Sequence, residues 1–491
     1  MTQPQMSRRA WLRWMFATGA SMALPLRNAL AVLKYEFVNI RVAIHPNNPA
    51  ILFDPAKCIY CGACKVVCNR KMGVDGFYDL TRTGDEPICV YCGQCTTVCE
   101  GDAITIRPEW QKVREAKATG KKIVVSTSPA VRVGLADAFG GKPGQYQQAQ
   151  VVALLRQLGA DIVFDVGFGA DITITEEATE LLERLKSGKP LPMFTSCCPS
   201  WVAFCEFFYP ELLSHVSRVK SPIAMQGATI KSYFAAKHNL DPKQIFNVAL
   251  TPCPAKKYEI ARPELNVDGL RDMDAIVTVR ELPHWLAAEG MTYDPTKTSD
   301  YDALMGEASS AGILFGNTGG VTETVLRTAY MMANGELPPE NFFSLTEVRG
   351  LLSPRVKVKT ATVQLLPDRE ITVAVVQGLA NARAVIKALK EGSLQADFVE
   401  VMACEGGCIG GAGMPLSKIQ PYVSKAMRQA RLDALQAQDS EKTALQQRVS
   451  WSNPPLRQLY DEFYKAPASE MAKRYLHTTY TSRANQLDVT P

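Results

Sequence analysis

The 491-residue sequence contains no run of about 20 consecutive apolar residues, the length that a helix needs to span a bilayer. It also lacks a large charge of one sign. The net charge is +5, and four arginines lie in residues 1–31, which contain no acidic residue, so the rest of the chain is close to neutral. The first absence predicts no transmembrane span, and the second gives no reason to expect a nucleic-acid partner.

Residues 1–31 have the features of a twin-arginine export signal. Arg8 and Arg9 precede a mostly apolar run over residues 14–26, and residues 29–31 have the small-x-small pattern of a cleavage site. An ordinary basic amphipathic helix is the alternative. Because this route exports folded proteins, we expect a periplasmic protein that acquires its cofactors in the cytoplasm. Its cysteines then need not form disulfides.

The chain is rich in cysteine, with 14 residues, and eight of them form two runs of spacing C-x2-C-x2-C-x3-C. Such duplicated runs bind two [4Fe–4S] clusters, and the fourth cysteine of each run binds the cluster of the other run. One predicted set is Cys58, Cys61, Cys64 and Cys99, and the other is Cys89, Cys92, Cys95 and Cys68. Structural zinc is the alternative for a lone C-x2-C pair but does not explain two runs of four. Residues 48–107 therefore resemble an α+β ferredoxin-like domain, although Asn69 and Glu100 stand where proline commonly follows the last cysteine.

Residues 120–420 alternate between strand-like and helix-like segments. Strands are predicted at 123–125, 162–166, 246–250, 275–279 and 371–376, and helices at 151–158 and 175–185. This alternation predicts an α/β domain with mostly parallel sheets covered by helices. Strand signals end near residue 421, so residues 421–491 are predicted to form a helical tail, broken at 453–455.

Five of the remaining six cysteines lie in three separated segments, at 195–201, 251–259 and 400–411. Each segment follows an apolar run, as do loops at the carboxyl ends of strands, where open α/β sheets place their sites. Glycines in the third segment allow the backbone to approach a bulky inorganic ligand closely. Taken alone, these cysteines are equally compatible with buried small hydrophobic residues, and Cys205 is predicted to be one.

Together these segments resemble the active-site domain of the iron-only, or [FeFe], hydrogenases. The resemblance covers residues 48–420, with the signatures in the family's order, and includes two further stretches at 128–132 and 315–323. It implies a two-lobed catalytic domain over residues 120–420. The two-cluster layout is similar to the periplasmic form, in which the export signal and the helical tail often belong to a separate small subunit. Here both are expected on the same chain as the large subunit.

The resemblance implies a third [4Fe–4S] cluster, joined through Cys408 to a two-iron unit with CO, cyanide and azadithiolate ligands. The implied ligands of this cluster are Cys198, Cys253, Cys404 and Cys408. Lys256 is implied to donate hydrogen bonds to one cyanide, since an ammonium group has three donors. A solvated surface pair with Lys257 is the alternative.

Other cavity residues are assigned by the same resemblance. Ser128, Pro129 and Ala130 are implied to contact the second cyanide, and Met402 is retained near the two-iron unit. Glu259 is expected to support the loop of the second signature.

Four positions depart from the family's usual residues. Thr251 and Ile223 replace methionine and glutamine, and Ala412 and Met414 replace glycine and glutamine. These changes bear on catalytic bias, CO affinity and oxygen tolerance but remove no ligand.

A proton path is also implied. The family's thiol at the position of Cys197 passes protons to the bridging amine, and the path continues outward through Glu177, Ser217 and Glu180. A thiol, with a pKa near 8.5, is suited to both giving and accepting a proton. Glu177 and Glu180 are three residues apart on a predicted helix and share a face. The alternatives are a buried packing role for Cys197 and simple solvation for the glutamates.

The resemblance implies a periplasmic hydrogenase that interconverts H2 with protons and electrons. Oxidation of H2 is the expected direction, with a c-type cytochrome or ferredoxin as electron partner and hydrogenase maturation proteins as assembly partners. A hydrogenase-like iron–sulfur protein that acts as an H2 sensor or in cluster assembly is the alternative. A simple electron carrier would leave about 300 residues without a role. The retention of Cys197, Lys256, Glu177 and Glu180 favours the enzyme.

Overall fold

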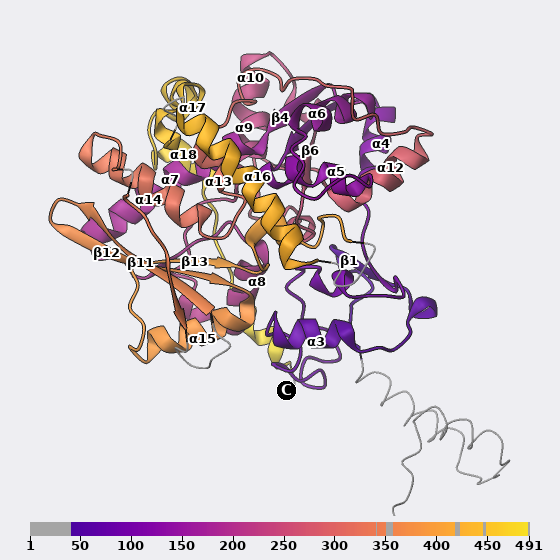
Figure 1. Ribbon diagram of the computed structural model, residues 1–491, viewed down its shortest axis with the longest axis horizontal. Helices are drawn as coiled ribbons and strands as arrows, with labels where there is room; N and C mark the ends of the chain where they lie inside the picture. Colours follow the sequence, from indigo (N-terminus) through magenta and orange to yellow (C-terminus); the bar gives the residue numbers. More distant parts are fainter. Residues whose placement is uncertain (1–40, 340, 350–356, 418–422, 445–447, 490–491) are drawn as a thin grey trace, which may run out of the picture.

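The computed structural model describes residues 41–491, except residues 340, 350–356, 418–422, 445–447 and 490–491 (Figure 1). The predicted export signal, residues 1–31, lies outside the described residues. Within the described part of the chain, no helix is both long and apolar enough to cross a membrane.

Residues 48–107 form a small module at the edge of the molecule, indigo in Figure 1. Strand β1 (Ile51–Phe53) pairs antiparallel with β2 (Ile104–Ile106) and joins the two ends of the module. Each cysteine run leads into a helical turn through a glycine with a left-handed φ, a conformation that favours glycine. The first turn continues as helix α3 (Ala63–Arg70), whereas the second is only the 3-10 helix η2 (Gln94–Thr97).

A four-stranded, fully parallel sheet forms the core of the first lobe, as predicted. Its order is β4 (Ile162–Asp165), β3 (Lys122–Thr127), β6 (Ile245–Thr251) and β9 (Ala275–Thr278). Alternate residues face α4 (Trp110–Ala118), α6 (Gln148–Gln157) and α12 (Leu282–Ala288) on one side, and α7 (Val166–Ser187) and α9 (Pro222–Thr229) on the other. Both faces are therefore buried, which explains the continuous β-branched runs in the sequence.

The second lobe contains a five-stranded mixed sheet, so the prediction of mostly parallel sheets holds for the catalytic domain as a whole but not for this sheet. Its order is β10 (Thr346–Arg349), β11 (Lys357–Leu366), β12 (Arg369–Gln377), β13 (Phe398–Met402) and β5 (Met193–Phe194). The β12–β13 and β13–β5 pairs are parallel, but β10, β11 and β12 pair antiparallel. Only two residues connect β11 to β12, and a connection this short permits only an antiparallel hairpin.

Helix α7 (Val166–Ser187) packs against α9 of the first lobe and α14 (Gly320–Asn334) of the second. Only its second half, 175–185, was predicted, and strand β4 ends one residue before the predicted 166. The side chain of Asp165 accepts a hydrogen bond from the Gly167 amide and so begins the helix at this point. Glycine and β-branched residues in the first half have low helix propensity, so burial of nearly the whole helix stabilises it instead.

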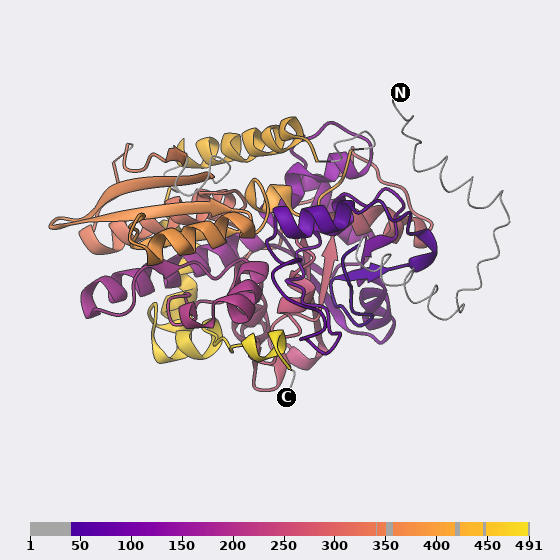
Figure 2. The ribbon, with the colours of Figure 1, turned by 90° about the horizontal axis from the view of Figure 1, so that it is seen from below.

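The tail is helical, as predicted, and wraps the body. Helix α16 (Lys425–Ala444) lies on one side of the molecule, and α17 (Pro454–Leu459) and α18 (Glu470–Leu476) lie on the opposite side (Figure 2). The predicted break at 453–455 is the start of α17, with proline at its first position. The last described residues of the tail lie beside the cysteine module, where the Val489 amide donates to the Arg82 carbonyl (2.8 Å).

Candidate active site

One cavity between the two lobes brings together residues from every signature segment. Its lining includes these predicted site residues: Ser128, Pro129, Ala130, Cys197, Cys198, Cys253, Lys256, Met402, Cys404 and Cys408. Thr251 and Ile223 also line the cavity. Ala412 and Met414 do not, because Ala412 packs beside Gly93 and Met414 joins the core of the first lobe.

The cysteines reach the cavity from the carboxyl ends of strands in both sheets, as predicted. Cys198 follows β5 and caps helix α8 (Pro199–Phe208), Cys253 follows β6, and Cys404 and Cys408 follow β13. The loop after β13 packs closely on its neighbours: a Cβ at Gly407 (φ +77°) would lie 2.7 Å from the Thr318 amide nitrogen. Parallel strands from two sheets thus direct their carboxyl ends toward one site.

The four cavity cysteines have the chemistry of a metal-cluster site. Burial raises the pKa of Cys253 well above that of an ordinary thiol, and the nearby Cys404 and Cys198 raise it further. Thiolates gathered here would repel one another unless cations bound between them. The described residues contain no group of His, Cys, Asp or Glu side chains suited to a single metal ion. Four thiolates around a shared cavity instead fit an iron–sulfur cluster.

Lys256 is buried at the wall of this cavity, and its ammonium group is held in place. It donates to both carboxylate oxygens of Glu259 (3.0 and 2.8 Å) and to the Cys197 carbonyl (3.1 Å). Glu259 also accepts from the Ser221 hydroxyl (2.9 Å), so it supports this loop as predicted. Lys257 is buried and pairs with Glu281 (2.8 Å), so the alternative of a solvated lysine pair is wrong.

Cys197 is buried and lies close to the buried carboxyl group of Glu177. Burial raises the pKa of its thiol, and the nearby Glu177 raises this pKa further. Burial and the neighbouring Glu180 likewise raise the pKa of Glu177 to about 8. Both carboxyl oxygens of Glu177 lack a well-formed hydrogen bond to any described residue. A neutral carboxylic acid beside a neutral thiol is suited to proton transfer.

The outer part of the predicted path is a continuous set of hydrogen bonds. The Ser217 hydroxyl donates to Glu180 (2.8 Å), and the other oxygen of Glu180 accepts from Arg184 (2.7 and 3.0 Å). Sequence reasoning missed Arg184, although its i,i+4 spacing from Glu180 is a recognisable ion-pair signal. All four predicted relay residues thus lie in one region between the cavity and the surface.

In the cysteine module, the neighbours of two cysteines agree with the crossed pattern that the spacing predicts. Burial raises the pKa of Cys64, and the nearby Cys61 and Cys99 raise it further. Burial likewise raises the pKa of Cys92, with Cys95, Cys68 and Cys89 nearby. Cys205, by contrast, is fully buried among apolar side chains, as predicted.

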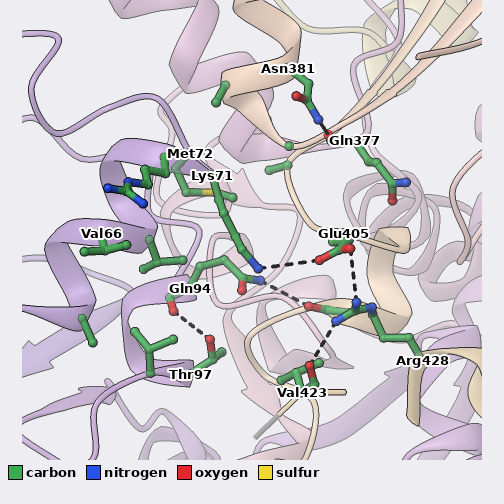
Figure 3. A pocket seen from close by; sticks show the side chains of 18 of the residues that line it. Val66, Lys71, Met72, Gln94, Thr97, Gln377, Asn381, Glu405, Val423 and Arg428 are labelled. Carbon is green, nitrogen blue, oxygen red and sulfur yellow. Dashed lines mark hydrogen bonds and ion pairs between the residues drawn. The ribbon is translucent and has the colours of Figure 1, made fainter. Parts of the chain in front are cut away.

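Gln94 connects the module to the active-site cavity, a contact that the sequence does not reveal. Its amide group donates to the Cys404 sulfur (3.2 Å) and to the Gly410 carbonyl (3.2 Å). Figure 3 shows Gln94 in the pocket between the module and the body, near the ion pairs of Glu405 with Lys71 and Arg428. Cys92 lies close enough to Cys404 to affect its pKa, so two cysteine groups adjoin here.

Glu400 is another residue whose role sequence reasoning missed, as it missed those of Arg184 and Gln94. Its buried carboxylate accepts from the Gly319 amide (2.7 Å) and from the Thr322 amide (2.8 Å) at the start of α14. It therefore joins the third cysteine segment to the stretch at 315–323, and from that stretch Phe315 and Gly316 line the cavity.

Comparison with known proteins gives a family match for the catalytic domain and another for the tail. Residues 121–412 match the family model for the C-terminal domain of the iron-only hydrogenase large subunit, and residues 425–483 match that for the iron hydrogenase small subunit. Iron hydrogenase 1 of Clostridium pasteurianum is 36% identical, covering 91% of this chain and 77% of that protein. The periplasmic [Fe] hydrogenase large subunit of Nitratidesulfovibrio vulgaris is 42% identical, covering 65% and 73%.

A solved structure and a more distant relative complete the comparison. An apo [FeFe]-hydrogenase variant from Chlamydomonas reinhardtii matches with a TM-score of 0.66 and 38% identity, covering 75% of this chain and 98% of that one. Cytosolic iron-sulfur assembly component 3 of Bos taurus is only 28% identical, covering 76% and 78%. The chain therefore belongs to the iron-only, or [FeFe], hydrogenase family, with large-subunit and small-subunit regions joined in one polypeptide.

Proposed function

We propose that this protein is a periplasmic hydrogenase that interconverts H2 with two protons and two electrons, with H2 oxidation as its main direction. The observation that carries the proposal is the single cavity lined by four cysteines, Cys197 and a buried lysine. An electron module and a proton path both adjoin this cavity. An assembly factor without turnover would not need the buried path from Cys197 to Glu180.

The proposed cofactors follow from the donor groups. The eight module cysteines hold two [4Fe–4S] clusters, and Cys198, Cys253, Cys404 and Cys408 hold a third, with Cys408 shared with the two-iron unit. When bound, this unit supplies the metal chemistry by which H2 is split or formed. Lys256 contributes a fixed positive charge at the cavity wall, and Ser128, Pro129 and Ala130 form another part of that wall.

Protons and electrons leave by different elements of the protein. In the oxidation direction, Cys197 passes a proton to Glu177, which passes it through Ser217 to Glu180 near the surface. Electrons leave past Gln94 through the module to a redox protein, for which we propose a c-type cytochrome or ferredoxin. The separation allows each path to be changed by mutation without disturbing the other.

Iron content tests this proposal. Protein produced with the hydrogenase maturation proteins is expected to contain about 14 iron atoms per chain and to oxidise H2. Protein produced without them is expected to contain about 12 iron atoms and to be inactive. H2 turnover by the second preparation would overturn the proposal.

A further inference from the structure

The C-terminal tail contacts the stretch of chain that carries the proton-path serine. The Lys220 amide donates to the Leu476 carbonyl (2.9 Å), and the Thr478 amide donates to the Arg218 carbonyl (2.7 Å). An antiparallel bridge also joins Val219 to His477. Residues 476–478 and 218–220 therefore form an isolated antiparallel bridge, which restricts the backbone next to Ser217.

Tyr480 bonds directly to the proton-path serine. Its hydroxyl donates to the Ser217 carbonyl (2.6 Å), while the Ser217 side chain donates to Glu180 (2.8 Å). Burial raises the pKa of Tyr480, so the phenol stays protonated and remains a donor. The backbone of an inner member of the path is thus held by a residue of the small-subunit region.

Glu176 anchors the same part of the tail. Its carboxylate is fully buried on α7 and accepts from Tyr460 (2.6 Å), the Ala468 amide (3.0 Å) and His477 (2.8 Å). All three donors belong to the tail. Although Glu176 adjoins Glu177 in sequence, one carboxyl group binds the tail and the other lies by Cys197.

The tail also forms part of the surface where the path reaches water. Glu180 and Arg218 line an open cavity there together with Lys473, His477, Thr478 and Thr479 of the tail. The side chain of Glu180 is 11% exposed and that of His477 is 15% exposed. Water that exchanges protons with Glu180 therefore lies against the tail.

We propose that residues 476–480 are a working part of the proton path, with Tyr480 as a positioning residue that holds Ser217 between Glu177 and Glu180. This inference rests on the proposed function, because it assigns a role within that path. Ser217 donates to Glu180 (2.8 Å) and lies near Glu177, with which it forms no hydrogen bond of ordinary length. Proton transfer along the path requires Ser217 to come within about 3 Å of each glutamate in turn. Loss of the Tyr480 contact frees the Ser217 backbone and lowers the fraction of time in which Ser217 is within reach of both.

The variant Tyr480→Phe tests the inference in the full-length, matured enzyme. It removes only the hydroxyl and keeps the ring, which lies near Arg262. The matched control is Tyr464→Phe, which also removes a buried tail hydroxyl, but one that bonds Thr229 rather than a proton-path residue. We expect Tyr480→Phe to keep the iron content and the CO and cyanide infrared bands of the wild type. Its turnover is expected to fall about tenfold, with a larger solvent isotope effect in D2O.

A second readout does not depend on turnover. The infrared carboxyl band that disappears in Glu177→Gln is expected to shift in Tyr480→Phe and to stay unchanged in Tyr464→Phe. An unshifted band with a wild-type isotope effect in Tyr480→Phe would overturn the inference, as would equal effects in both variants. Failure of the proposed function is distinct: the wild type itself would then lack CO and cyanide bands and H2 turnover.

Discussion

At the scale of single residues, Cys197 and Cys198 have different surroundings. Those of Cys197 suit a proton carrier, and those of Cys198 suit a metal ligand. Burial raises the pKa of both thiols. Around Cys198, backbone hydrogen bonds from Ala403 and the start of α8, together with Lys256, favour the thiolate that a metal needs. Around Cys197, the nearby Glu177 and other acidic groups favour the protonated thiol. The two adjacent cysteines are therefore suited to the opposite roles that we propose for them.

The variants Cys197→Ala and Cys198→Ala distinguish these roles. Cys197→Ala is expected to keep its iron and its CO and cyanide bands but to lose at least about 100-fold in turnover, the contribution of a positioned acid or base. Cys198→Ala is expected to lose iron from the active-site cluster. Iron analysis and infrared spectroscopy on both proteins check this. Iron loss confined to Cys197→Ala would reverse the assignment, and full activity of Cys197→Ala would mean that protons use another route.

Glu177 gives a prediction about pH. Its pKa is raised to about 8 by burial and by Glu180, so the carboxyl group is neutral at pH 7 and ionises as the pH rises through about 8. The infrared band of the neutral carboxyl is expected to disappear over this range and to be absent in Glu177→Gln. Turnover of Glu177→Gln is expected to fall at least about 100-fold.

The control for this variant is Glu183→Gln, on the same helix but half-exposed and paired with Lys189. It is expected to keep wild-type turnover. A Glu177 band that titrates near pH 4.5, the ordinary value for glutamate, would contradict the assignment.

At the scale of elements, helix α7 connects the proton path to the tail. Besides Glu176, Glu177 and Glu180, it carries Asp171, which is fully buried. Asp171 accepts from the Ser309 amide (2.8 Å) and hydroxyl and from two tail residues, Ser450 (2.7 Å) and Asn453 (2.9 Å). A single carboxylate therefore joins helix α7, the start of helix α13 (Ser310–Leu314) and the tail.

The variant Asp171→Asn tests this junction. An amide replaces one acceptor oxygen with a donor, so it faces the donors of Ser309 and Asn453 and leaves them unsatisfied. We expect a loss of about 1–3 kcal/mol in the free energy of tail docking, seen as faster limited proteolysis within the tail. Asp433→Asn, at an exposed position on α16, serves as the control. Equal proteolysis of the two variants would contradict the role of Asp171.

The elements that the sequence predicted are those whose signals are local. Cysteine spacing, the parallel strands of the first lobe and the helical tail depend on periodicity and motif, and the structure contains them. The antiparallel half of the second sheet was missed, although β11 carries alternating Val and Thr residues and a two-residue connection to β12 that favour a hairpin. The contacts of Gln94 with Cys404 and of Tyr480 with Ser217 span hundreds of residues, so no local pattern reveals them.

At the scale of the whole molecule, the module and the tail enclose the catalytic domain from different sides (Figures 1 and 2). The module adjoins the cavity through Gln94, and the tail adjoins the proton path through Tyr480. Because the small-subunit region and the large-subunit region belong to one chain, each catalytic domain is made with one tail.

Export is tested by replacing Arg8 and Arg9 with lysine. Because folding does not depend on these residues, active enzyme is expected to accumulate in the cytoplasm. Activity measured in separated periplasmic and cytoplasmic fractions checks this. Unchanged periplasmic activity would show that residues 1–31 are not a twin-arginine signal.

The infrared spectrum of the matured protein tests most directly whether the cavity between the lobes holds a two-iron unit with CO and cyanide ligands. We expect CO and cyanide stretching bands that change when H2 is added, and no such bands in protein made without the maturation proteins. A matured protein that oxidises H2 but shows no CO or cyanide band would contradict the central claim.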